Sequence, residues 1–178
     1  MPVPGGSGAH SRGASPAPPP PYGAPAQQPP ASGFRVPLAD TTPFPGAQAG
    51  QPVAYDEAQP VFVGSAIFER AVHPCKIVPA FSPPPRVAYG GAEHEHRGRY
   101  DLLPFDPATM EWVPAANGQI PSGRRPIEGG YEENGEKLYH ALASVNGTMV
   151  PGKTGTHLGA ANVPWGGQEH CIRQYQIL

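Results

Sequence analysis

The chain has 178 residues and a formal net charge of −2, and its 27 prolines and 23 glycines make up more than a quarter of it. No lysine and arginine cluster extends beyond Arg124-Arg125, so the sequence lacks the basic stripe of a nucleic-acid-binding surface. Because it also lacks an apolar run of roughly 20 residues and a secretory leader, we expect a cytoplasmic protein without a membrane span, which would leave the cell only by unconventional export.

Residues 1–33 contain proline, glycine, serine, alanine and glutamine with almost no aliphatic side chains. Such a segment cannot bury enough apolar area to offset the entropy of ordering its backbone, which predicts a disordered arm. Within it, Pro18 to Tyr22 favours polyproline II, and Pro19-Pro20-Pro21-Tyr22 fits the pattern that WW modules bind. Two interpretations stay open here, a solubilising linker and a ligand for a WW-type partner.

From Phe34 onward, aliphatic and aromatic residues return in short bursts of strand length. Turn signals such as Asn117-Gly118, Asn146-Gly147 and Gly166-Gly167 separate them, and no 3.6-residue periodicity lasts long enough for a helix. We therefore predict an all-β fold, most simply a β-sandwich.

The same block is written twice, at an offset of 76 or 77 residues. Tyr89-Gly90-Gly91-Ala92-Glu93-His94 recurs as Trp165-Gly166-Gly167-Gln168-Glu169-His170, and Pro74-Cys75-Lys76 recurs as Pro151-Gly152-Lys153. A constant offset over a whole block indicates a duplicated structural unit. We place the first repeat at 34–105 and the second at 110–178, with 34–178 forming one compact unit.

One apparent motif is a coincidence of the second repeat. Residues 147–154 satisfy the phosphate-loop pattern G-x-x-x-x-G-K-[ST], which binds phosphate only where it opens a helix. The residues after Thr154 cannot sustain a helix, and the first repeat has Cys75 in place of the glycine. The pattern therefore does not predict nucleotide binding.

Both repeats keep a lysine after a proline, about 20 residues behind a carboxylate. The pairs are Asp56 with Lys76 and Glu132 with Lys153, and a strand, turn and returning strand would bring each pair to one sheet edge. Because an ammonium only donates and a carboxylate only accepts, together they can hold two neighbouring sugar hydroxyls. The alternative is an ordinary exposed ion pair of at most about 1 kcal/mol.

Other candidate chemistry is weaker. His94 and His96 would share one face of a strand, but the second repeat offers no matching pair, so we expect no metal and no cofactor. The Gly-Gly-x-Glu-His element is better explained as a tight turn whose glutamate accepts hydrogen bonds from backbone amides. No nucleophile and base repeat together, so we do not expect an enzyme. Cys75 and Cys171 fall at non-equivalent positions, which favours free thiols.

With these residues in view, the chain resembles the DM-nine repeat family, found in invertebrate mannose-binding lectins and natterin-like proteins. The resemblance rests on Trp112-Val113-Pro114, Asn117-Gly118-Gln119-Ile120-Pro121, Gly129-Gly130-Tyr131, Leu138-Tyr139, Val150-Pro151-Gly152-Lys153, Trp165-Gly166-Gly167-Gln168-Glu169 and Tyr175-Gln176-Ile177-Leu178. It covers residues 34–178, more closely in the second repeat than in the first.

The resemblance implies a tandem-repeat β-sandwich, often a homodimer, that binds mannose-type glycans without a metal. Carried over by position, the sugar-binding residues become Glu132 with Lys153 and Asp56 with Lys76. Tyr131, Tyr55 and Trp165 are candidates for stacking on the sugar. If the Pro-Gly-Lys turn needs a positive φ, Cys75 compromises the first site. The alternative function is a non-catalytic interaction scaffold that uses the proline-rich arm and a self-associating β-domain.

Overall fold

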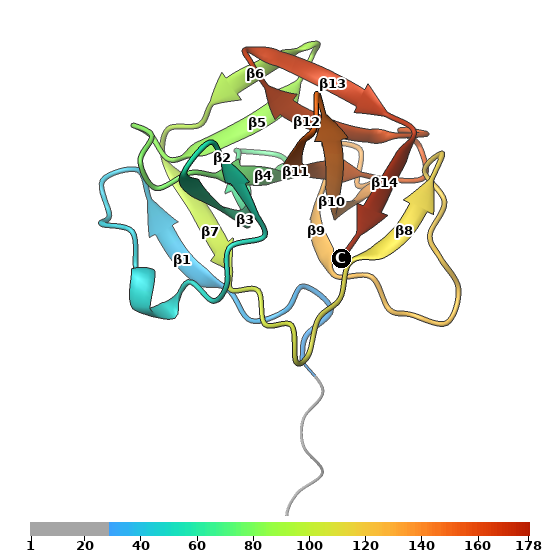
Figure 1. Ribbon diagram of the computed structural model, residues 1–178, viewed down its shortest axis with the longest axis horizontal. Helices are drawn as coiled ribbons and strands as arrows, with labels where there is room; N and C mark the ends of the chain where they lie inside the picture. Colours follow the sequence, from blue (N-terminus) through green and yellow to red (C-terminus); the bar gives the residue numbers. More distant parts are fainter. Residues whose placement is uncertain (1–28) are drawn as a thin grey trace, which may run out of the picture.

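The computed structural model describes residues 29–178, which form 14 antiparallel strands and one short 3₁₀ turn at Gly46–Gln48 (Figure 1). None of the described residues form a helix that is long and apolar enough to cross a membrane. The strands of the first repeat are β1 (Val36–Ala39), β2 (Ala54–Asp56), β3 (Gln59–Ile67), β4 (Val72–Ile77), β5 (Pro85–Tyr89), β6 (Ala92–Glu95) and β7 (Arg99–Leu103). Those of the second are β8 (Val113–Ala116), β9 (Glu128–Tyr131), β10 (Lys137–Val145), β11 (Thr148–Thr154), β12 (Ala161–Trp165), β13 (Gln168–Ile172) and β14 (Gln174–Ile177).

The duplication in the sequence is a duplication of strands. The first repeat pairs its strands in the order β1-β7-β3-β4-β5-β6, and the second pairs its own in the equivalent order β8-β14-β10-β11-β12-β13. The two orders join where β6 meets β13, at the register pair Ala92 and Gln168. The predicted all-β fold is therefore confirmed, and the strand order of one repeat recurs in the other.

The sheets do not form the separate, face-to-face layers that a simple sandwich would have. Strand β9 pairs with β10 and, through Tyr131 and Val72, also with β4 of the first repeat. This second pairing closes the ring β4-β5-β6-β13-β12-β11-β10-β9, a barrel of eight antiparallel strands, and the other strands extend from it. Gly130 permits the closure: with φ of 153°, it lies where a Cβ atom would be 2.0 Å from the carbonyl oxygen of Val72.

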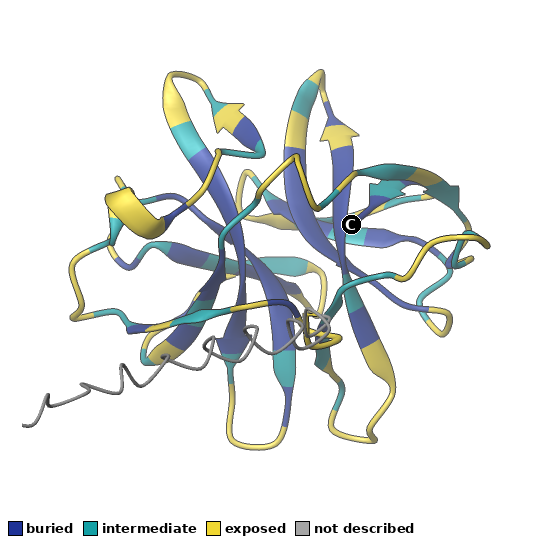
Figure 2. Cartoon of the chain, turned by 90° about the horizontal axis from the view of Figure 1, so that it is seen from below, coloured by how far each residue is buried: buried dark blue, intermediate teal, exposed yellow. Residues whose placement is uncertain are grey.

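Each repeat retains its own apolar core. In the first, Phe62, Ile77, Tyr100 and Leu102 are among the buried residues of one cluster; in the second, Val145, Val150, Val163, Tyr175 and Ile177 belong to another. Figure 2 shows the buried residues along the middle of the strands in both halves, with exposed residues at the turns. Because side chains alternate along a strand, the opposite faces of β4–β6 and β11–β13 point away from these cores. Those faces carry the lysine that both repeats have, Lys76 in β4 and Lys153 in β11.

Pro74-Cys75-Lys76 and Pro151-Gly152-Lys153 lie inside strands β4 and β11, whereas the sequence had suggested turns. Gly152 is not among the residues with a positive φ, so Cys75 causes no backbone strain. Gly152 instead lets β12 approach, because a Cβ atom there would lie 2.3 Å from the carbonyl oxygen of Asn162. The first repeat makes its close approach elsewhere, at Gly64, where a Cβ atom would lie 2.0 Å from the carbonyl oxygen of Asp101.

The beginning of the described chain is attached to the second repeat. The amide of Glu128 donates to the carbonyl of Ala31, and Arg125 donates to that of Pro29. The ordered part therefore starts before residue 34, where the sequence placed the end of the arm. Residues 1–28, with the proposed WW ligand at Pro19 to Tyr22, lie outside the described residues.

Candidate functional site

The two repeats meet through a symmetric pair of turns. Gly90-Gly91 connects β5 to β6, Gly166-Gly167 connects β12 to β13, and all four glycines have positive φ, as the predicted tight turns require. The amide of Glu93 donates to the carbonyl of Gly167, and the amide of Glu169 donates to that of Gly91, both at 3.1 Å. This reciprocal contact faces the two lysine-bearing surfaces toward each other.

Lys153 is buried at this junction, with only 3% of its surface exposed. Its Nζ atom lies 3.2 Å from Nδ1 of His73, on β4 of the other repeat, and 5.2 Å from the centroid of the Tyr89 ring. Burial lowers the pKa of the Lys153 ammonium, while Glu132 and Glu169 oppose the shift. Cation–π contact with Tyr89 is a further stabilising interaction for a charge removed from water.

His73 connects the lysine to the acid. Burial and then the charge of Lys153 lower the pKa of His73 to about 4, so its imidazole is neutral at pH 7. Because Lys153 can only donate, Nδ1 of the neutral ring is the acceptor and Nε2 carries the proton. That N–H lies 3.7 Å from Oε2 of Glu132, whose other oxygen accepts from His157 at 3.1 Å. The predicted pair Glu132 and Lys153 is thus brought together with His73 between its members.

A cavity of about 360 Å³ opens beside this chain of groups. His73 and Glu132 line it together with Phe68, Tyr89, His94 and Glu133, and both repeats contribute to it. Tyr89 and Phe68 are 57% and 43% exposed, so aromatic surface is available next to the polar groups. The size lies in the range of small-molecule sites.

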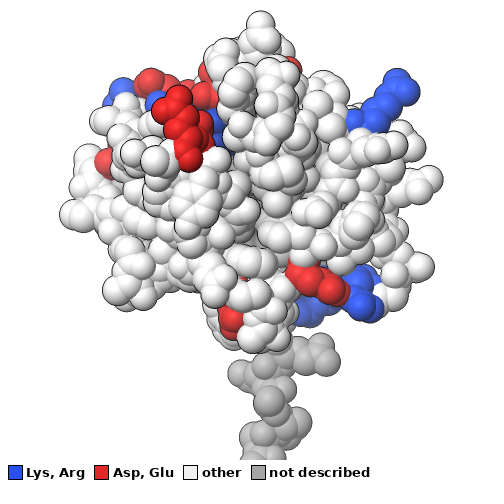
Figure 3. Space-filling model, in the orientation of Figure 1, with Lys and Arg blue, Asp and Glu red and all other residues white. Residues whose placement is uncertain are grey.

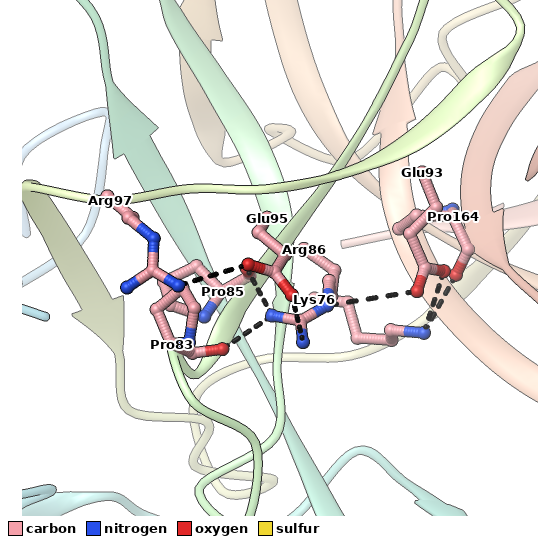
Figure 4. A network of polar contacts seen from close by, with 8 residues as sticks. All are labelled: Lys76, Pro83, Pro85, Arg86, Glu93, Glu95, Arg97 and Pro164. Carbon is pink, nitrogen blue, oxygen red and sulfur yellow. Dashed lines mark hydrogen bonds and ion pairs between the residues drawn. The ribbon is translucent and has the colours of Figure 1, made fainter. Parts of the chain in front are cut away.

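The first-repeat pair is arranged differently. Lys76 is as buried as Lys153, but its Nζ atom donates to the carbonyl of Pro164 at 2.9 Å and contacts Oε2 of Glu93 at 3.3 Å (Figure 4). Asp56, at the end of β2, has no ion pair within residues 29–178. The structure therefore does not join Asp56 to Lys76 as it joins Glu132 to Lys153.

The aromatic candidates also separate. Tyr55 and Tyr131 are 60% and 48% exposed, and neither lines the cavity at His73. Trp165 packs against the core of the second repeat. Phe68 and Tyr89 line the cavity instead, and Tyr89 could have been found from the sequence because the repeat offset aligns it with Trp165. His73 had no such signal, because its counterpart in the second repeat is Val150.

Several other patterns resolve into structural roles. The phosphate-loop pattern falls on a hairpin and strand β11, where the hydroxyl of Thr154 is buried and donates to the carbonyl of Ala160. Glu169 does accept a backbone hydrogen bond, from the amide of Gly91 across the repeat boundary. Within residues 29–178, no three His, Cys, Asp or Glu side chains are grouped to hold a metal ion, and both cysteines are free thiols.

The face of the molecule shown in Figure 3 carries acidic and basic side chains in small separate groups on a largely uncharged surface. The cavity at His73 is lined by three carboxylates, three imidazoles and by aromatic and aliphatic side chains, and it has no lysine or arginine in its lining. Such a lining suits a neutral, hydroxyl-bearing ligand better than a polyanion.

Comparison with known proteins agrees with the fold. The crystal structure of the nematode sperm cell motility protein MFP2B matches with a TM-score of 0.57 and 14% sequence identity. The match covers 81% of this chain and 45% of that one, so this chain spans less than half of the motility protein's length. At this identity the likeness concerns the fold alone. No curated protein sequence is a significant match.

A family model for the DM9 repeat matches residues 55–172, well over half of the chain. The matched region runs from β2 to β13 and includes both lysines, both Gly-Gly turns and the contact between the repeats. The chain therefore belongs to the DM9 repeat family.

Proposed function

We propose that the protein binds carbohydrate of the mannose type without a metal, in the cavity between its repeats. The observation that supports this proposal most is that the His73 ring lies between Lys153 and Glu132, next to exposed aromatic rings. A sugar hydroxyl both donates and accepts, so it can donate to the Glu132 carboxylate and accept from the N–H of His73. The apolar face of the pyranose ring can then lie against Tyr89.

In this arrangement Lys153 acts through His73. By donating to Nδ1, the ammonium keeps the proton of the neutral ring on Nε2, the atom nearest Glu132. Without that donor, the imidazole could adopt the other tautomer and present an acceptor toward the ligand. Lys153 is therefore proposed as a positioning residue, and Glu132 and His73 as the groups that contact the sugar.

The test is retention of the full chain on immobilised mannan, with EDTA present to remove divalent cations. We expect the wild type to bind and Glu132→Gln and Lys153→Met each to lose at least about tenfold in affinity. Glu132→Gln removes a charge-assisted contact to the sugar, and Lys153→Met removes the donor that fixes the tautomer of His73. Lys137→Met is the matched control, since Lys137 is an exposed lysine of the same repeat that pairs with Glu128. Wild-type protein that passes through the column unretained would refute the proposal.

The alternative is a non-catalytic interaction scaffold. It is favoured by an apolar groove of about 580 Å³ lined by Pro30, Phe34, Met110, Ile127 and Leu178, in which Phe34 is 71% exposed. The structural similarity to MFP2B adds only that a related fold occurs in a cell motility protein. Deletion of residues 1–28 separates the two functions: a glycan-binding protein keeps its affinity for mannan, whereas a scaffold that recruits WW-type partners loses them.

A further inference from the structure

Strand pairing places four residues side by side across each repeat, with the lysine second in both rows. The residues opposite one another are Val63, Lys76, Arg86 and Glu95 in the first repeat, and His140, Lys153, Asn162 and Cys171 in the second. Directly opposite residues in an antiparallel sheet have their side chains on the same face. The lysine is thus kept while its neighbour changes from a charged Arg86 to a neutral Asn162.

In the first repeat, this neighbour belongs to a continuous row of charges (Figure 4). Arg86 lies 3.9 Å from one oxygen of Glu93 and 3.6 Å from Glu95, and its guanidinium is fixed over the ring of Phe81. The second oxygen of Glu93 contacts Lys76, whose ammonium also donates to the carbonyl of Pro164. Lys76 therefore has a carboxylate and a carbonyl of its own protein as partners.

In the second repeat, the equivalent carboxylate is held elsewhere. One oxygen of Glu169 accepts from the side-chain amide of Asn162 at 2.9 Å, and the other accepts from the backbone amide of Gly91 at 2.7 Å. Each oxygen thereby has a hydrogen-bond partner other than Lys153, and the hydrogen-bond partner of Lys153 is His73. Asn162 is half-buried, and its Oδ1 atom is buried with no hydrogen-bond partner. The opposite orientation of the amide would place Oδ1, which can only accept, against the Glu169 carboxylate, so the side-chain NH₂ group is the one that faces Glu169.

We infer that Asn162 is a positioning residue, which holds Glu169 away from Lys153 and so leaves Lys153 to contact His73. In the first repeat Arg86 has no such effect, and Glu93 pairs with Lys76. The chain therefore has one sugar site, at Lys153. The inference rests on the proposed function, since it specifies which of two homologous positions binds. The residue equivalent to His73 in the second repeat, Val150, agrees with this inference. A site at Lys76 would need an imidazole at that position, and valine offers none.

The binding test compares Lys76→Met with Lys153→Met, because methionine keeps an unbranched apolar stem and removes only the ammonium. We expect Lys153→Met to lose at least about tenfold in affinity for immobilised mannan, and Lys76→Met to keep wild-type affinity while melting at a lower temperature. Equal losses of affinity in the two folded variants would overturn the inference. Should Lys76→Met not fold, Glu93→Gln replaces it, with the same expectation of unchanged affinity.

A second measurement does not depend on sugar. The ¹⁵N shifts of the His73 imidazole report which nitrogen carries the proton, and in the wild type we expect Nε2 to carry it. Asn162→Ala frees Glu169 to turn to Lys153, which should withdraw the donor from His73 and mix the two tautomers. The control is Gln168→Ala, an exposed residue next to Glu169 that should leave the spectrum unchanged.

Mannan binding and the His73 tautomer test the proposed function and the role of Asn162 separately. Wild type that does not bind mannan, but whose His73 tautomer responds to Asn162→Ala, would refute the proposed function and keep the role of Asn162. Wild type that binds mannan while His73 is unaffected by Asn162→Ala would refute the positioning role alone.

Discussion

Lys76 and Lys153 occupy equivalent places in the equivalent strands β4 and β11, but their surroundings differ. Lys76 is satisfied by Glu93 and Pro164, within a row of alternating charges. Lys153 contacts a neutral histidine from the other repeat, next to a cavity. The difference teaches that duplication has kept a buried ammonium while changing its partners: one lysine is bound by a carboxylate and a carbonyl, and the other contacts a neutral imidazole beside a cavity.

The largest effect on stability should come from removing the first lysine. Lys76→Met leaves the Glu93 carboxylate, whose side chain is 13% exposed, without its closest cation, and we expect a loss of about 3 kcal/mol in the free energy of unfolding. Lys153→Met removes a desolvated ammonium with a neutral partner and should change stability by less than about 1 kcal/mol. Urea denaturation of the two variants measures both. Equal losses would mean that the two surroundings do not differ in energy.

Exchanging the small residues of the repeats should cost nearly as much. Gly64→Ala and Gly152→Cys each give one repeat the residue that the other already has, but each places a Cβ atom against a backbone carbonyl. We expect about 2 kcal/mol of destabilisation from each, which is typical of overpacking. Cys75→Gly is the control, because it creates space and should cost about 1 kcal/mol or less. Thermal unfolding monitored by circular dichroism distinguishes these values.

Acid should weaken the junction through His73. Its pKa in the folded protein, about 4, lies below the ordinary value of 6.5, so the unfolded chain binds the proton more readily. The contribution of neutral His73 to the free energy of unfolding is fully present above about pH 6.5 and is lost as the pH falls toward 4. We expect the free energy of unfolding to fall by roughly 2 kcal/mol between pH 7 and pH 5. His73→Val, which copies Val150, should flatten this part of the stability profile. His140, fully buried and with a lowered pKa, contributes in the same direction and remains in the variant.

The smallest perturbation concerns the thiols. Cys171 is exposed, whereas Cys75 is 1% exposed and burial raises the pKa of its thiol. Iodoacetamide should therefore modify Cys171 in the native protein and reach Cys75 only after unfolding, because the thiolate is the reactive form. Mass spectrometry of the peptides identifies the modified residue. Rapid native labelling of Cys75 would mean that β4 opens easily, contrary to the closed ring.

Much of the fold could be predicted because its signals are local. Gly90-Gly91 and Gly166-Gly167 specify tight turns, the apolar bursts match strands, and the constant offset predicts equal strand orders. Of the two carboxylate–lysine pairs predicted for the candidate site, Glu132 and Lys153 do lie on either side of one side chain, and their role in binding stays a prediction. Asp56 and Lys76 do not meet, because a carboxylate nearer in space, Glu93, takes the lysine. His73 was missed because it belongs to the first repeat, whereas Glu132 and Lys153 belong to the second, and because the second repeat has Val150 at the equivalent position.

The amino-acid sequence was sufficient for the duplication, the strands and the residues that both copies retain, since backbone propensities and side-chain alternation act over a few neighbouring positions. Three features emerged only in the tertiary structure: ring closure through Val72 and Tyr131, the placing of His73 between Glu132 and Lys153, and the contact of Glu93 with Lys76 where Glu169 instead contacts Asn162. These depend on distances between residues far apart in the chain, which backbone propensities and side-chain alternation do not determine.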